Sequence, residues 1–235
     1  MKLPNIFLKG ASGSGKDYSL RNLDPKSTVM INTEDKALPF RKTFPVASVK
    51  NPTAQSYFAA QTAMFAKCIA NPDIRVIIVN SFTSACERIL TEAQVVYTEW
   101  DVWAYYNKCI TDMLRLSKTV DNKYIIFTGI DDNIVGPNGI QKNSIKVQGN
   151  VWFGKVEKEF TIVLQTHVQE IPSGGVDYLF ITNRCAGFAN TDIKTPPGIL
   201  PERMPNDMAE VIRLCDDFYL DAAPIDSPLT TEPTN

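Results

Sequence analysis

The sequence predicts an α/β fold in which helices flank a mostly parallel sheet that ends in an antiparallel hairpin. A Gly-rich phosphate-loop pattern follows the first apolar strand, and strand-like and helix-like segments then alternate along the chain. Two strand-like runs near the end are joined by a segment that contains a Pro-Ser-Gly-Gly turn. Such alternation is typical of parallel sheets, whose crossover connections need a long segment, whereas a tight turn joins antiparallel strands.

Length and composition fit one such domain. The chain has 235 residues, of which 44% are hydrophobic, and we expect residues 1–221 to form a single P-loop NTPase-like domain. Residues 222–235 form an acidic tail rich in Pro, Ser and Thr, which we expect to be disordered. The net charge of −2 gives no overall attraction to nucleic acids or membranes. No apolar run is long enough to cross a membrane, so we expect a cytoplasmic protein.

A phosphate-loop (Walker A) pattern, G-x-x-x-x-G-K, spans residues 10–16. Residues 5–9 predict the strand before it and residues 16–23 the helix after it. In this motif backbone N–H groups turn toward phosphates, the lysine reaches the terminal phosphates, and the helix N-terminus attracts the same anion. The residues expected to bind ATP or ADP are Gly10, Ser12, Gly13, Ser14, Gly15, Lys16 and Asp17.

Two positions depart from the usual magnesium site. The residue after the lysine is normally Ser or Thr, whose hydroxyl binds Mg²⁺, but here it is Asp17. Residues 75–80 predict a buried strand of the Walker B type, which normally ends in Asp but here ends in Asn80. The formal charge is unchanged, which is compatible with a swapped Mg²⁺ site held by Asp17 and Asn80. The alternative is an impaired site, because a carboxylate at position 17 would repel a triphosphate without Mg²⁺.

The other elements follow from hydrophobic pattern and breaker residues. Strands are predicted at residues 28–32, 124–129, 158–166 and 177–183, and helices at residues 55–70, 84–118 (one long or broken helix) and 207–220. Residues 36–45 and 130–152 predict loops. A loop as long as the second is usually functional or disordered in a compact domain.

The chain resembles phage-encoded ATP-binding proteins of the RecA-like/AAA-type P-loop class, among them phage single-strand annealing recombinases. The matching segments are GASGSGKDYSLRNLDP, INTEDKALPF, RVIIVNSFT, YIIFTG, VQGNVWFGKVEKEFTIVL, YLFITN and KTPPGILPERMPNDM. The resemblance implies a RecA-like fold and an ATP-binding accessory of DNA recombination or replication in the host cell cytoplasm. It also implies a homo-oligomer, either a ring or a filament.

The resemblance extends to individual site residues. Glu34, just past the second strand, matches the acid that polarises the attacking water; on the residues alone, a solvated loop acid is an equal reading. Arg184 and Lys194 lie where a basic residue would complete a neighbouring subunit's site. Ile130 occupies the place of a polar γ-phosphate sensor, which leaves Thr128 or Asp131 as substitutes.

The resemblance also places single-stranded DNA at residues 130–153, where RecA-like proteins carry mobile DNA-binding loops. Lysines there can meet phosphates and two aromatic rings can stack on bases, whereas neighbouring acids offset the charge. These residues are Lys142, Lys146 and Lys155, then Trp152 and Phe153, and finally Asp131, Asp132 and Glu157.

Three functions are compatible with these residues. The first is an ATP-dependent phage recombination or replication accessory that acts on single-stranded DNA. The second is a non-hydrolysing nucleotide-binding module with a structural or regulatory function. The third, a small-molecule P-loop kinase, is the least favoured because no Arg-rich lid is visible. Asp17 and Asn80 predict weak or absent hydrolysis, so whether the chain is an enzyme stays open.

Overall fold

The computed structural model describes residues 2–41, 44–49, 57–135, 139, 141–152 and 154–220. Its helices are α1 (Tyr57–Ala70), α2 (Phe82–Val96), α3 (Glu99–Lys118) and α4 (Met208–Tyr219), with short 3-10 turns η1 (Tyr18–Leu20) and η2 (Val156–Glu159). Its strands are β1 (Ile6–Lys9), β2 (Thr28–Asn32), β3 (Val46–Ala47), β4 (Val76–Asn80), β5 (Tyr124–Gly129), β6 (Asp131–Val135), β7 (Gln141–Ile145), β8 (Ile162–Glu170), β9 (Val176–Ile181) and β10 (Arg203–Pro205).

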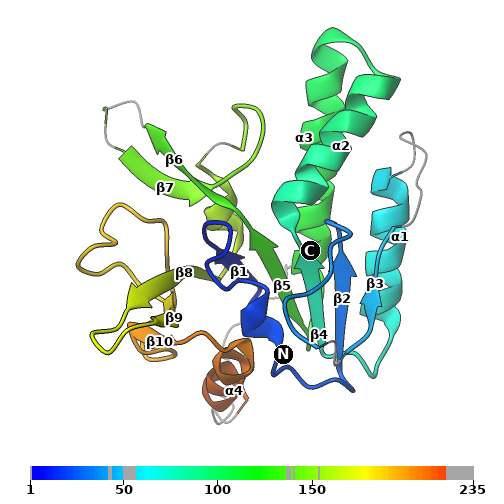
Figure 1. Cartoon of the computed structure of the whole chain (residues 1–235). Coiled ribbons are helices and arrows are strands. Elements are labelled where there is room, and N and C mark those ends of the chain that lie inside the picture. The colour runs from blue at the N-terminus through cyan, green and yellow to red at the C-terminus, as the bar shows by residue number, and fades with distance from the viewer. Residues whose placement is uncertain are drawn as a thin grey trace, which may run out of the picture.

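Eight strands form one mixed sheet in the order β10-β9-β8-β1-β5-β4-β2-β3 (Figure 1). The strands from β8 to β3 are parallel to their neighbours, and β9 and β10 pair antiparallel at one edge. The predicted α/β class, the mostly parallel sheet and the C-terminal antiparallel portion are therefore confirmed. In addition, β6 and β7 form a separate antiparallel hairpin.

The strand order reverses at β1, which determines where a ligand is expected. The chain passes from β1 to β2 on one side, returns through β4 and β5, and then crosses to β8 on the other side of β1. In open α/β sheets, ligands bind beyond the carboxyl ends of the strands at such a reversal. The phosphate loop leaves β1 at this place.

Helices cover both faces of the sheet, which explains the continuous apolar runs of its central strands. Phe7, Ile77 and Phe127 point to the face covered by α1, α2 and α3. Their neighbours in sequence point to the opposite face, where α4 and η1 pack. Figure 1 shows α2 and α3 as an antiparallel pair that extends past the sheet, with α4 at the far end of the molecule.

The helix predicted at residues 16–23 is wrong, because the structure forms only the turn η1 (Tyr18–Leu20) there. The segment is short, and Pro25 follows it closely. Its Ser, Asn and Asp side chains also compete for backbone groups: the Ser19 hydroxyl donates to the Lys16 carbonyl at 2.6 Å. The phosphate loop therefore lacks a long helix dipole, and an anion there depends on backbone N–H groups and Lys16.

The helical stretch predicted at 84–118 is confirmed in its broken form, as the two helices α2 and α3. Two other predictions need correction. The predicted loop 130–152 contains the β6–β7 hairpin. The strand predicted at 158–166 begins later, as β8 (Ile162–Glu170), because η2 occupies the residues before it. The helix α4 begins as expected, with Asp207 accepting a capping bond from the Ala209 N–H at 3.0 Å. The predicted disordered tail, 222–235, lies outside the described residues.

Among the described helices, none has both the length and the apolar character that crossing a membrane requires.

Candidate nucleotide-binding site

The phosphate loop is held tightly against β8. A Cβ atom added to Gly10 would lie 1.9 Å from the Thr166 hydroxyl oxygen, so only glycine fits there. The Ser14 hydroxyl donates to the Ala11 carbonyl at 2.7 Å and lies 2.5 Å from the same Thr166 oxygen. These contacts fix the curvature of the loop before any ligand binds.

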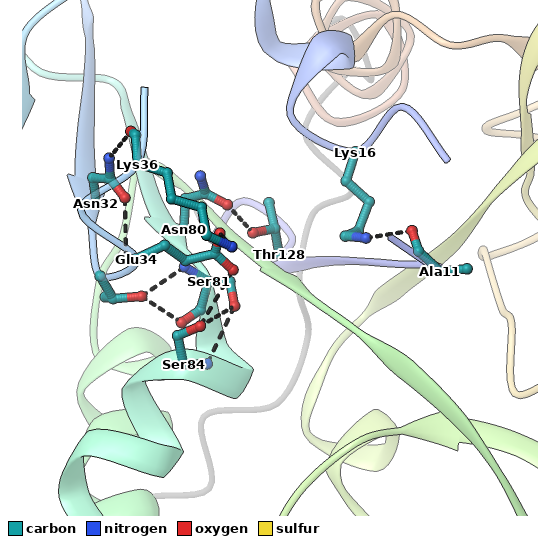
Figure 2. Close-up of polar contacts among 10 residues, drawn as sticks. Ala11, Lys16, Asn32, Glu34, Lys36, Asn80, Ser81, Ser84 and Thr128 are labelled. Atoms are coloured by element: carbon teal, nitrogen blue, oxygen red, sulfur yellow. Dashed lines mark hydrogen bonds and ion pairs between the residues drawn. The ribbon is translucent and has the colours of Figure 1, made fainter. Parts of the chain in front are cut away.

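Lys16 curls back over this loop. Its ammonium group donates to the Gly10 carbonyl at 2.7 Å and to the Ala11 carbonyl at 2.8 Å. Figure 2 shows the contact with Ala11. Burial lowers the pKa of Lys16 below its usual value, while the nearby charges of Asp17, Asp131 and Glu34 oppose this shift. A phosphate beside the loop would give this ammonium a stronger, charge-assisted partner than the two carbonyls.

The loop opens onto a pocket of about 510 Å³. The pocket lies at the carboxyl ends of β1, β2, β4 and β5, where the reversal of strand order predicts a ligand. Its size suits a small-molecule ligand. Its lining includes Ser12, Gly13, Gly15, Lys16, Asp17, Glu34 and Asn80. Five of the seven predicted phosphate-binding residues, the predicted catalytic acid and both predicted metal ligands therefore line one pocket, whereas Gly10 and Ser14 shape the loop beneath it.

The two unusual positions line the same pocket. The Asn80 side chain is close enough to Asp17 to oppose the rise in the pKa of that carboxyl, while the Asn80 amide oxygen accepts a hydrogen bond from the Thr128 hydroxyl. Figure 2 shows the contact between Asn80 and Thr128. A carboxylate next to an amide stands where the usual motif would place a hydroxyl next to a carboxylate. The two departures thus lie near each other in space, as a matched pair.

The residues fit a magnesium ion only in part. Mg²⁺ is usually held by one or two carboxylates together with phosphate oxygens and water. Asp17 offers a carboxylate on the pocket wall, and the charge of Glu34 is close enough to act on it. The Asn80 oxygen, by contrast, is engaged by Thr128, which argues against Asn80 as a direct ligand. Among the described residues, no group of three or more His, Cys, Asp or Glu side chains is placed to hold a metal ion.

Glu34 is fixed by the loop after β2. Thr33 joins the ends of β2 and β4, because its hydroxyl donates to the Ser81 carbonyl and accepts from the Ser81 N–H, each at 2.7 Å. The Glu34 carboxylate then accepts a hydrogen bond from Ser84 at 3.2 Å and pairs with the Lys36 ammonium at 3.1 Å (Figure 2). Glu34 is therefore a held carboxylate on the pocket wall, and not the solvated loop acid of the alternative interpretation.

The predicted phosphate sensor is not formed as expected. Ile130 lines the pocket, but Thr128 is buried and its hydroxyl is used by Asn80. Asp131 begins β6, within the predicted loop 130–152, and accepts a hydrogen bond from Gln165 at 2.8 Å. Gln165, on β8, was missed by sequence reasoning, because a polar residue inside an apolar strand has no motif to mark it.

Arg184 and Lys194 lie away from this pocket. With Lys142, Lys158, Glu157 and Asp192 they line a separate hollow of about 400 Å³. Arg184 pairs with Asp192 at 3.0 Å, and burial lowers the pKa of Lys194. Within one chain, then, neither residue reaches the phosphate loop, and their predicted contact with a neighbouring subunit stays a prediction.

A buried ion pair behind the loop was missed by sequence reasoning. Lys9, the last residue of β1, is fully buried; its ammonium donates to the Asn143 carbonyl at 2.9 Å and lies 3.6 Å from the Glu157 carboxylate. Glu157 in turn accepts bonds from the Ser144 hydroxyl and the Ile145 N–H, each at 2.6 Å. This pair connects the phosphate-loop strand to the β6–β7 hairpin. A lysine that ends an apolar run gives no sequence signal of burial.

Only some of the side chains predicted to bind single-stranded DNA are accessible to a ligand. Trp152 is only 8% exposed, so its ring is not free to stack on a base, and Phe153 lies outside the described residues. Lys142 forms an ion pair with Asp192 at 2.5 Å. Lys146 and Lys155 are exposed and remain able to meet a phosphate backbone. DNA binding by this region stays a prediction. It now rests on the exposed lysines, because the buried Trp152 ring cannot stack on a base.

The Asp17 carboxyl gives a pH-dependent prediction. Burial, and next the charge of Glu34, raise its pKa above the ordinary 3.8. The folded state therefore holds this proton more tightly than the unfolded state, so stability falls as pH rises from about 4 through the folded-state pKa. Asp17→Asn removes the titrating group. Without nucleotide, we expect the Tm of the variant minus the Tm of the wild type to increase as pH rises from 4 to 7. If this difference stays constant over that range, the prediction is wrong.

A scan against protein-family models and a search of curated proteins find no match to this chain.

Proposed function

We propose that this chain is an ATP- or ADP-binding protein whose phosphate site is the loop of residues 10–17. The observation that carries the proposal is one pocket of about 510 Å³ lined by that loop, Lys16, Asp17, Glu34 and Asn80 at the strand reversal. Backbone N–H groups and a lysine supply the positive field, and the pocket has room for more than inorganic phosphate. The nucleotide would bring Mg²⁺, held on the protein side by Asp17.

The same geometry favours slow or absent hydrolysis. Glu34 is placed on the pocket wall to orient a water molecule, as the resemblance implies. However, Asn80 carries no carboxylate and its amide oxygen is bonded to Thr128, so the Mg²⁺ shell would lack the strand carboxylate that P-loop enzymes use. This favours the non-hydrolysing module as a second candidate beside the ATP-dependent accessory.

The resemblance also supports a biological setting for this nucleotide site. Resemblance to the RecA-like phage proteins supports an accessory of DNA recombination or replication that acts on single-stranded DNA and assembles as a ring or filament. The parallel sheet with its reversal at β1 agrees with such a fold. The exposed Lys146 and Lys155 would supply phosphate contacts.

Binding and turnover, measured separately, test the proposal. ATP and ADP affinity and ATP hydrolysis are measured with and without Mg²⁺ and with and without single-stranded DNA. We expect saturable binding and turnover well below about 1 s⁻¹, the lower end of typical enzymes. Turnover of about 1 s⁻¹ or more would overturn the slow-hydrolysis part and favour the swapped Mg²⁺ site. Absence of nucleotide binding would overturn the whole proposal.

Assembly tests the predicted contact between subunits. We expect ATP with Mg²⁺ to increase light scattering at tens of micromolar protein, about the range in which weak interfaces form. Arg184→Ala or Lys194→Ala should reduce this response without unfolding the chain. Arg213→Ala is a matched control, because Arg213 is similarly exposed and ion-paired, on α4. The prediction is wrong if the protein stays monomeric when ATP and Mg²⁺ are added. It is also wrong if Arg213→Ala reduces the increase in light scattering as much as Arg184→Ala or Lys194→Ala does.

A further inference from the structure

Two tyrosine rings line the same pocket as the phosphate loop. Tyr18 belongs to η1, directly after the loop, and Tyr178 belongs to β9 in the antiparallel part of the sheet. They are 42% and 38% exposed, and their ring centroids are 6.4 Å apart with the planes at 52°. Aromatic rings that stay open to solvent beside a phosphate site can stack on a nucleobase.

The backbone places both rings close to the phosphate-binding groups. Tyr18 follows Lys16 by two residues. Tyr178 lies against the loop itself, since a Cβ atom added to Gly15 would be 2.7 Å from its ring. Gly15 also has a φ of +91°, in the region that favours glycine. The absence of a side chain at this position thus lets an aromatic ring from a distant strand approach the loop.

Arg21 holds the two tyrosine segments together. Its guanidinium carbon lies 4.1 Å from the Tyr18 ring centroid, so it covers one face of that ring. The same group donates to the Tyr18 carbonyl at 2.9 Å and to the Asn206 carbonyl at 3.0 Å. The Asn206 N–H donates to the Tyr178 carbonyl at 3.1 Å. Arg21 is therefore a positioning residue for the tyrosine pair.

We propose that Tyr18 and Tyr178 bind the base of the nucleotide by stacking, so that the site recognises a base as well as a phosphate chain. This rests on the proposed function, because the phosphate loop supplies the anchor next to which the base would lie. Stacking depends on the ring face more than on the identity of the base. The pair would thus accept adenine and guanine alike, and the larger purine ring should bind better than a pyrimidine.

Ligands that differ only in the base separate this proposal from the proposed function. Calorimetry of the full chain compares ATP, GTP, ribose 5′-triphosphate and inorganic tripolyphosphate, each with Mg²⁺. A stacked base predicts that ATP and GTP bind about fivefold to a hundredfold more tightly than ribose 5′-triphosphate. If ATP and ribose 5′-triphosphate bind equally, the stacking proposal is overturned and phosphate binding stands. If none of the four binds, the proposed function itself fails.

Variants then assign the effect to the two rings. Tyr178→Ala and Tyr18→Ala should each bring ATP affinity toward that of ribose 5′-triphosphate, while tripolyphosphate affinity changes less than about twofold. Tyr97→Ala is the matched control, because Tyr97 is also 38% exposed and packs on a second tyrosine, Tyr105, at 4.9 Å, in the connection between α2 and α3. A preference for ATP over ribose 5′-triphosphate that survives in both variants would overturn the assignment to these rings.

Discussion

Lys16→Ala is expected to weaken ATP and ADP binding by at least about tenfold. The lysine would form a charge-assisted contact with phosphate, and losing such a contact costs about 1.5–3 kcal/mol. The fold should survive, because the Lys16 ammonium bonds to the Gly10 and Ala11 carbonyls of its own loop and to no other element in the described part of the chain. Isothermal titration calorimetry measures the affinity, and thermal unfolding without ligand confirms the fold.

Two outcomes decide this prediction. Equal ATP affinity in the wild type and the Lys16→Ala variant would show that the loop does not bind phosphate. As a matched control, Lys26→Ala removes an exposed lysine that is also near the N-terminus but does not line the pocket. A tenfold loss in the Lys26 variant as well would indicate a general loss of positive charge instead of a specific contact.

The double change Asp17→Thr with Asn80→Asp is expected to raise ATP hydrolysis by about tenfold or more, whereas neither single change should. The structure gives the reason. Asn80→Asp alone places a carboxylate against Asp17, with Glu34 also near, whereas Asp17→Thr alone leaves no carboxylate for the Mg²⁺ shell at either position. The double change restores a hydroxyl beside a strand carboxylate. Steady-state phosphate release in saturating ATP and Mg²⁺ measures the effect.

Adding Glu34→Gln to the double variant is the control. If Glu34 orients the attacking water, this third change should remove most of the gained activity, since a catalytic base typically contributes about 10²–10⁴-fold. Retention of the gain would assign the water-orienting function to another residue. A rise in hydrolysis from Asn80→Asp alone would contradict the interpretation of Asp17 and Asn80 as a matched pair.

The buried strands could be predicted from the sequence because their signal is local. Residues 28–32 and 124–129 match β2 and β5 at both ends, since each is a continuous run of apolar and β-branched residues buried on both faces. The G-x-x-x-x-G-K spacing alone indicated Gly10, Gly15 and Lys16 as a phosphate-loop pattern.

The sequence-based predictions failed where tertiary contacts, and not local sequence patterns, determine the structure. The β6–β7 hairpin consists largely of Asp, Asn, Gln, Lys and Ser, residues that are mostly rare in strands, and the two strands form a small sheet separate from the main one. Asp17, in the loop after β1, and Asn80, at the end of β4, meet at one pocket although β5 lies between those strands in the sheet. No single segment carries information about such a pairing. The tyrosine pair likewise joins η1 to β9.

Backbone amide NMR during an ATP titration with Mg²⁺ tests the central claim most directly, because it locates the ligand as well as detecting it. Binding by the phosphate loop predicts that the largest chemical-shift changes and the strongest protection from hydrogen exchange fall on the amides of residues 12–17. The amides of Glu34 and Asn80, which also line the pocket, should show the next largest chemical-shift changes. If these amides do not change at millimolar ATP, or if the largest changes fall outside this pocket, the chain does not bind nucleotide through its phosphate loop.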